Sequence, residues 1–310
     1  MPLLNQVYRD PLLSDVSIKY QNNAFVASQV WPTLPVTKDT NYIFKYDKTN
    51  LKKPVSTARD QYARANRVDF GLTQIPLPAL REASLEIALP DVVRDEAQDP
   101  FDPMIDYTEV VTEQILIEKE AALINLLTSA AITQGTTFNS TTKWNAPSTS
   151  NPFGDIQTGK TAILQNTASK DANVLLMGRG VFDALVNHPM ILDRLKYTQT
   201  ADQAAVKGIM AAAFGVERVV VGESVYNGAA EGLTDSMSFL WPNSAWLLYV
   251  APTAGTRNVS AGYFLSRPDQ QYVDTWVEQE RKLTVIRAND YYAPYLMAAE
   301  AVYYFQGAVA

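Results

Sequence analysis

The sequence predicts an α+β fold in which extended segments accompany two folded regions. Helix-compatible sequence runs without a breaker from Pro103 to about Ile132, roughly 30 residues or ~45 Å of helix, whereas the mean globular helix has ~11 to 12 residues. Helix and strand patterns alternate between about 155 and 268. Residues 39–80 contain few large aliphatic side chains, too few to enclose a core of their own.

The first 85 residues divide into an arm and a hairpin. Residues 1–35 are interrupted by four prolines and are expected to be an irregular arm. In residues 36–85, aromatic residues alternate with other residues from Tyr42 to Tyr46, which indicates a strand, and residues 67–72 are expected to form the returning strand. Because the connection is polar, we expect a projecting hairpin that rests on another surface.

The long helix is expected to lie in the region 86–154. Asp102 is a suitable N-cap and Pro103 suits the first helical position. Gly135 is expected to end the helix, and a Thr/Ser/Asn-rich loop follows it. Apolar residues fall on several faces of this helix, so we expect it to be contacted on more than one side.

The region 155–268 is expected to be a self-contained α/β unit. The sequence predicts helices at 155–167, 181–187, after Pro189 and at 202–214, and strands at 173–177, 216–221, 238–241, 245–250 and 262–265. In the remaining residues, 269–310, we expect extended runs at 272–280, 282–287 and 295–305.

Composition excludes several kinds of chemistry. The 310 residues include 33 acidic and 26 basic side chains, one His and no Cys, which excludes disulfides, Cys-ligated metals and thiol nucleophiles. A net charge of −7 argues against a protein whose main task is to coat nucleic acid. Neither a signal peptide nor an apolar run of membrane-spanning length is evident, so we expect a soluble compartment. We expect no cofactor and no metal.

Candidate catalytic residues have simpler structural explanations. His188 could act as a general base, and Glu278 and Glu280 share a strand face as a glycosidase pair would. A histidine at a helix C-terminus and charged residues on the solvated face of a strand explain them more simply. The turn at 178–180 lacks the third glycine of the dinucleotide-binding pattern and the Gly-Lys-Ser/Thr of the P-loop. A soluble hydrolase stays an alternative, and our first interpretation assigns no catalytic residue.

Charge is distributed unevenly along the chain. Residues 45–67 contain seven basic and two acidic side chains, and residues 91–120 contain ten acidic and two basic ones. Four acidic residues of the long helix fall within about 60° of one another, as one stripe. A solvated acidic face would explain the stripe, and so would a hairpin of one subunit that lies across the helix of another. The second interpretation predicts intersubunit contacts by Lys45, Lys52, Lys53, Arg59, Arg64, Arg67, Asp106, Glu109, Glu113 and Glu120.

The order of these regions resembles the major capsid proteins of tailed bacteriophages, which have the HK-ninety-seven-like fold. The segments that carry the resemblance are VLLMGRGVFDALVNHPMILDRLKY (174–197), FGVERVVVGESVYN (214–227), LWPNSAWLLYVAP (240–252) and VEQERKLTVIRANDYYAPYLMAAEAVYYF (277–305). The resemblance implies an N-terminal arm (1–35), an extended loop (36–85), a peripheral domain with a spine helix (86–154), an axial domain (155–268) and returning C-terminal strands (269–310).

The resemblance also implies a function. Such proteins assemble into hexamers and pentamers of an icosahedral shell around double-stranded DNA, so we expect the chain to bind copies of itself and to contact DNA only non-specifically. Scaffolding, portal and decoration proteins are further expected partners, and a membrane is not. We expect the chain in the virion capsid, assembled in the host cytoplasm. An encapsulin-type nanocompartment shell is the alternative within the same fold.

Overall fold

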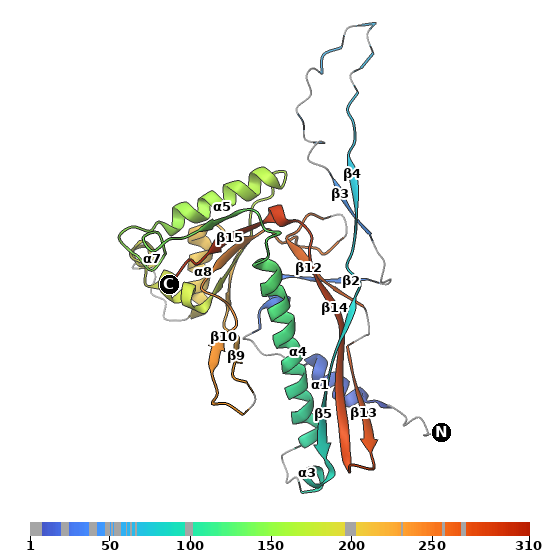
Figure 1. Ribbon diagram of the computed structural model, residues 1–310. Helices are drawn as coiled ribbons and strands as arrows, with labels where there is room; N and C mark the ends of the chain where they lie inside the picture. Colours follow the sequence, from blue (N-terminus) through green and yellow to red (C-terminus); the bar gives the residue numbers. More distant parts are fainter. Residues whose placement is uncertain are drawn as a thin grey trace.

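The computed structural model shows an elongated body, an α/β region on one side of it and a hairpin that projects beyond both (Figure 1). The residues that the structure describes are 8–19, 25–36, 42–46, 50, 52, 57–59, 61–62, 64–65, 67–96, 102–195, 203–230, 232–255, 258–267 and 271–310. Lys53 lies outside these residues.

The elongated body is built on a six-stranded sheet. Its strands are β1 (Tyr8–Arg9), β2 (Thr33–Pro35), β5 (Arg81–Pro90), β12 (Gly262–Ser266), β13 (Tyr272–Glu278) and β14 (Leu283–Leu296). The 14-residue β14 organises the sheet, because it pairs antiparallel with β5, β13 and β12. The sheet therefore joins residues near 85 to residues near 290.

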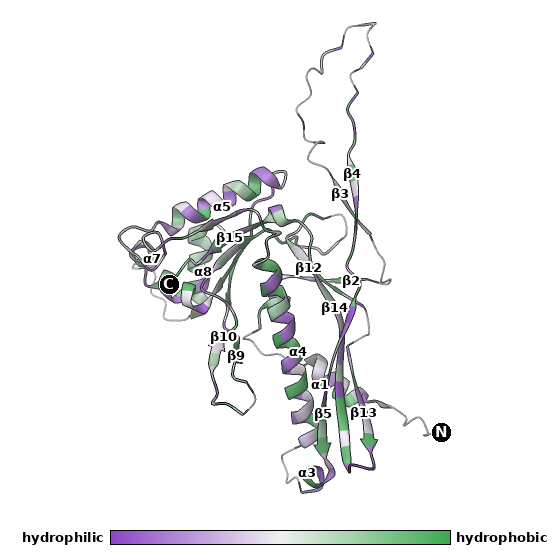
Figure 2. Ribbon diagram, viewed as in Figure 1, coloured by the Kyte–Doolittle hydropathy of each residue, from purple (hydrophilic) through white to green (hydrophobic). Residues whose placement is uncertain are grey.

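Helix α4 (Pro103–Leu127) runs beside β5 and β14 (Figure 1). Asp102 caps it as predicted, since the backbone N–H of Met104 donates to the Asp102 carboxylate at 3.0 Å. Lys119 joins α4 to β14 through an ion pair with Asp290 at 3.2 Å. Figure 2 shows hydrophobic and hydrophilic residues interleaved along the visible side of α4.

The second sheet has five strands in the order β6-β15-β11-β7-β8. Its strands are β6 (Gly135–Thr137), β7 (Val174–Gly178), β8 (Arg218–Gly222), β11 (Ala245–Leu248) and β15 (Val302–Gln306). The helices of this region are α5 (Pro152–Asn166), α6 (Arg179–Val186), α7 (Pro189–Leu195) and α8 (Gln203–Phe214). Two short hairpins stand apart from both sheets: β3 (Tyr42–Tyr46) with β4 (Leu72–Pro76), and β9 (Val225–Asn227) with β10 (Met237–Phe239).

The two faces of the second sheet belong to different hydrophobic cores. Leu175 and Met177 of β7 point into a core that α5, α6 and α8 complete. Val174 and Leu176 point into the other core, which contains Leu123 of α4 and extends to the six-stranded sheet. Because neighbouring residues of a strand face opposite sides, this sheet is covered on both faces, and α4 connects the two parts of the molecule.

The structure corrects the expected irregular arm. Its described residues include α1 (Pro11–Lys19) and the short α2 (Ala27–Val30), as well as β1 and β2. Asp10 caps α1, because its carboxylate accepts the backbone N–H of Leu12 at 2.9 Å. The described residues of this region, 8–19 and 25–36, thus pack onto the six-stranded sheet and α4.

Several expected boundaries also move. Helix α4 ends at Leu127 rather than near Ile132. Its C-cap residue, Thr128, donates its hydroxyl to the carbonyl of Ile124 at 2.8 Å. The returning strand of the projecting hairpin lies at 72–76 rather than 67–72. The expected run at 295–305 is divided between the end of β14, the 3₁₀ helix η2 (Ala299–Ala301) and β15. Here local β propensity does not show where one strand leaves its sheet and the next enters another.

Candidate assembly surfaces

The β3–β4 hairpin extends away from the body of its own chain (Figure 1). Five residue pairs join its strands, from Tyr42–Pro76 to Tyr46–Leu72. Beyond the strands, the side-chain amide of Asn50 donates to the carbonyl of Gly71 and accepts its N–H, both at 2.8 Å. The two arms of the hairpin are therefore held together past the last strand pair.

The basic residues of the hairpin are exposed where the structure describes them. Lys52, Arg59, Arg64 and Arg67 are all exposed, and Lys45 lies in β3. The hairpin also exposes large hydrophobic side chains, with Tyr62 99%, Val68 72% and Phe70 70% exposed. Exposed apolar residues that gather on one projecting element indicate a surface for a partner.

The acidic residues of α4 do not form one exposed stripe. Asp106, Glu109 and Glu113 are half-buried, but Glu120 is fully buried. The prediction that Glu120 contacts another subunit is wrong, because the arm and the α/β region cover this side of α4 within the same chain.

Glu120 lies at the junction of three parts of the molecule. Its carboxylate accepts the backbone N–H of Val26 in the arm at 3.0 Å and the hydroxyl of Ser224 at 3.0 Å, and it also accepts the indole N–H of Trp241. Burial raises the pKa of Glu120, and these hydrogen bonds oppose the rise. The carboxylate therefore ties α4, the arm and the segments that flank β9 and β10 to one point.

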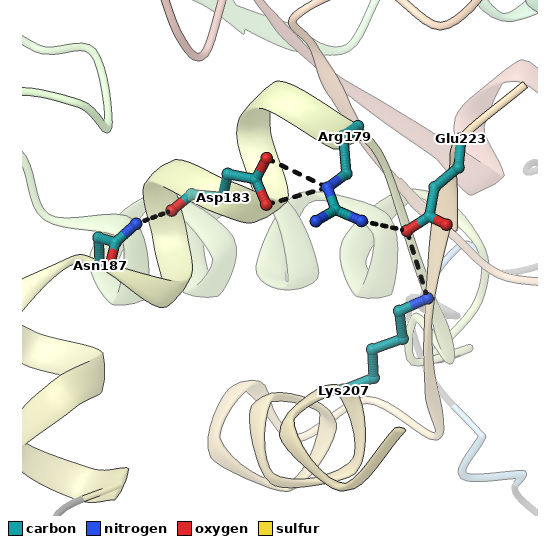
Figure 3. Close-up of polar contacts among 5 residues, drawn as sticks. All are labelled: Arg179, Asp183, Asn187, Lys207 and Glu223. Atoms are coloured by element: carbon teal, nitrogen blue, oxygen red, sulfur yellow. Dashed lines mark hydrogen bonds and ion pairs between the residues drawn. The ribbon is translucent and has the colours of Figure 1, made fainter. Parts of the chain in front are cut away.

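A second charged cluster joins elements of the α/β region (Figure 3). Arg179, the first residue of α6, donates to Asp183 at 3.0 Å and to Glu223, just after β8, at 2.9 Å. Lys207 of α8 approaches Glu223 at 3.9 Å. The two bases and two acids pair with one another, so the cluster links α6, α8 and the end of β8.

His188 and the two glutamates considered for hydrolysis lie in different parts of the molecule. His188, between α6 and α7, is buried, and its Nε2 lies 3.1 Å from the hydroxyl of Ser150. Burial lowers the pKa of His188, which favours the neutral ring. Glu278 and Glu280 lie at the turn between β13 and β14, at the far end of the other sheet (Figure 1). Glu278 pairs there with Arg281 at 3.6 Å, so the arrangement favours structural roles.

The described part of the chain contains neither a metal-binding cluster nor a membrane-spanning helix. No group of three or more acidic or histidine side chains among the described residues is placed to hold a metal ion. Within the same residues, no helix combines the length and the apolar character that a membrane span requires.

Sequence reasoning missed the β9–β10 hairpin. It predicted a strand near 238–241 but no partner for it, whereas Met237–Phe239 pairs with Val225–Asn227. The available signal was the turn-forming sequence between the two strands. Residues 228–235 contain two glycines and a Thr-Asp pair, and Asn227 directly precedes them.

Comparisons with known proteins agree with one another. The family described as phage major capsid protein E matches residues 110–265. The major capsid protein of Burkholderia phage BcepMu is 28% identical over 309 residues, which cover 96% of each protein. A phage-related protein of Bordetella bronchiseptica has a similar structure, with a TM-score of 0.72 and 22% identity over 97% of this chain and 98% of its own. The capsid of a native GTA particle has a TM-score of 0.57 at 11% identity, over 98% of this chain and 94% of its own.

Proposed function

The chain belongs to the phage major capsid protein E family, and we propose that its copies assemble into the hexamers and pentamers of an icosahedral shell that encloses double-stranded DNA. Its fold is the HK-ninety-seven-like fold of phage capsid proteins. In this fold the six-stranded sheet with α4 corresponds to the peripheral domain, and the α/β region corresponds to the axial domain.

The observation that carries the proposal is the uncovered β3–β4 hairpin. It combines exposed aromatic and aliphatic side chains with exposed Lys and Arg, and within its own chain it pairs only as a two-stranded ribbon in the described residues. An isolated two-stranded hairpin is at best marginally stable in water. A neighbouring copy in a shell would provide the surface that it lacks.

We infer that the basic hairpin of one copy lies across the acidic part of α4 of the next. Lys45, Lys52, Lys53, Arg59, Arg64 and Arg67 would face the carboxylates of Asp106, Glu109 and Glu113. Each exposed ion pair contributes at most ~1 kcal/mol, so these pairs would steer and align copies more than they would add affinity. The apolar residues of the hairpin would supply more of the binding free energy.

Location and further partners belong to the same proposal. The chain would be part of the virion capsid and would assemble in the host cytoplasm. Scaffolding, portal and decoration proteins would act on the growing or finished shell. DNA would meet the inner surface only through non-specific contacts, as suits a chain with a net charge of −7.

Charge reversal of the hairpin tests this function. The variant with Arg59→Glu, Arg64→Glu and Arg67→Glu should remain folded by circular dichroism but should lose most of its assembled particles in sedimentation and negative-stain microscopy. The matched control replaces the same three residues with Lys, which keeps the charge, and it should assemble. Normal assembly of the charge-reversed variant would contradict the proposed contact.

The unmodified chain tests the broader proposal. Expressed alone and together with a candidate scaffolding protein, it should form uniform shells. A chain that stays monomeric under all conditions would refute a shell-forming role. Particles isolated from an infected or induced host should contain double-stranded DNA, and a protein cargo in its place would favour the nanocompartment alternative.

A further inference from the structure

The β9–β10 hairpin is an isolated ribbon that leaves the axial domain. It projects on the side of the molecule opposite to the β3–β4 hairpin (Figure 1). Its connecting loop is held by Asn227, which donates to Asp235 at 2.7 Å and accepts the backbone N–H groups of Ala229 and Ser236, each at 3.0 Å. The hairpin is therefore a defined element, although neither of its strands joins a larger sheet.

One face of this hairpin is apolar. Phe239 lies directly opposite Val225, and Met237 is two residues from Phe239 on the same strand, so all three side chains share a face. They are exposed to 54%, 40% and 66%. Ser238 points to the other face. The apolar face defined by Val225, Met237 and Phe239 thus lies open in the single chain.

The β3–β4 hairpin carries a segment of matching pattern. Val68, Phe70 and Leu72 are exposed large hydrophobic residues at alternate positions, and Figure 1 shows this stretch continuing in line with β4. Alternate residues of an extended chain lie on one side. Residues 67–72 therefore present an apolar edge of the same length scale as the apolar face of the β9–β10 hairpin.

Charge also matches between the two elements. Residues 223–240 contain three acidic side chains and no basic one, whereas residues 45–67 carry the excess of basic side chains described above. Asp235 at the end of β9–β10 is exposed, as are Arg64 and Arg67 beside the apolar segment. Opposite charges around two apolar surfaces favour one register of docking over others.

We propose that residues 67–72 of one copy cover the apolar face of the β9–β10 hairpin of the next copy. This inference rests on the proposed shell-forming function. The two surfaces differ and lie on opposite sides of the subunit, so each copy uses one surface toward each neighbour, which is the head-to-tail contact that closes into a ring. The contact extends the hairpin binding site from α4 of the neighbour to its axial domain.

Engineered disulfides test the contact directly, because the natural chain contains no Cys. The test variant combines Phe70→Cys with Phe239→Cys, and a second variant combines Val68→Cys with Met237→Cys. The matched control combines Phe70→Cys with Ser238→Cys, which places the second thiol on the neighbouring residue but on the opposite face. Particles of each variant are oxidised, denatured without reductant and separated by gel electrophoresis.

The expected result is a ladder of covalent multimers, up to complete rings, for at least one test variant. Each single-cysteine variant should give nothing above the dimer, and the Ser238→Cys control should stay mostly monomeric, because disulfides require close and correctly directed Cβ atoms. Particles that form normally but show no ladder with either test variant would overturn this contact and leave the shell-forming function intact. Failure of the unmodified chain to form particles would instead overturn the function on which the inference rests.

Discussion

Replacing Glu120 should lower the free energy of unfolding of the single chain by an amount that depends on the replacement. In the native chain its two carboxylate oxygens accept hydrogen bonds from Val26, Ser224 and Trp241. Alanine would leave these three donors buried without an acceptor. Glutamine would keep one oxygen but would place an NH₂ group against a donor.

The magnitude follows from the number of donors. A buried donor without a partner costs ~1 to 3 kcal/mol, so Glu120→Ala should destabilise the chain by about 3 kcal/mol or more. Glu120→Gln should cost about 1 to 2 kcal/mol, since the oxygen that accepts from Ser224 and Trp241 can be kept. The desolvation cost of the charge disappears in both variants, which limits the loss.

The same residue gives a pH dependence with a defined sign. Its pKa is raised above 4.5 in the folded chain, so the folded chain holds a proton that the unfolded chain releases. Its contribution to stability is therefore fully present below pH 4.5 and is lost as the pH rises through the folded pKa. When Glu120 is protonated, the Ser224 hydroxyl can turn and accept the new O–H.

Urea unfolding of the unassembled chain at pH 4.5 and at neutral pH measures both effects. The wild-type chain should lose more stability than Glu120→Gln between these two conditions, since the variant lacks the titrating group. Glu118→Gln, at an exposed position two residues away, is the control and should change the free energy of unfolding by less than ~0.5 kcal/mol. Equal pH dependence of the wild type and Glu120→Gln would refute the reasoning.

Two further predictions concern packing around the six-stranded sheet. Gly262→Ala would place a Cβ 2.5 Å from the Trp31 ring and should lower the free energy of unfolding by ~1 to 3 kcal/mol, as measured in urea. Gly208→Ala is the control, because nothing lies within 4 Å of its Cβ, and it should raise the free energy of unfolding slightly. Equal effects of the two substitutions would contradict the close packing of Gly262 against Trp31. Lys119→Met should cost about 2 to 3 kcal/mol because it leaves the buried Asp290 without its ion-pair partner. Adding Asp290→Asn should recover part of this loss in a double-mutant cycle. Strict additivity of the two substitutions would argue against the ion pair.

The starts of two helices show how much of the fold can be predicted from local sequence alone. The Asp-Pro signal at 102 and 103 predicts the start of α4 correctly, and the cap hydrogen bond confirms it. The same signal at Asp10 and Pro11 precedes α1, although the nearby prolines give the arm an irregular pattern. This element could have been predicted from the sequence.

The end of α4 and the place of Glu120 could not have been predicted in this way. The carbonyl of Leu127, at the end of the helix, accepts the indole N–H of Trp246 at 2.9 Å, a partner more than a hundred residues away in the chain. Glu120 falls within the acidic stripe on a helical projection, but such a projection does not tell which flank another segment covers. On a helix with apolar residues on several faces, only the tertiary contacts decide this.

The topology of the two sheets also has a consequence for synthesis on the ribosome. Strand β15 lies between β11 and β6, and among the described strands β5 pairs with β14 alone. Neither sheet can close until residues beyond 300 and 290, respectively, have left the exit tunnel. Contacts so distant in the chain make folding slow, and nascent chains would expose both cores during elongation. Assembly-competent surfaces would therefore appear together, once β15 has emerged.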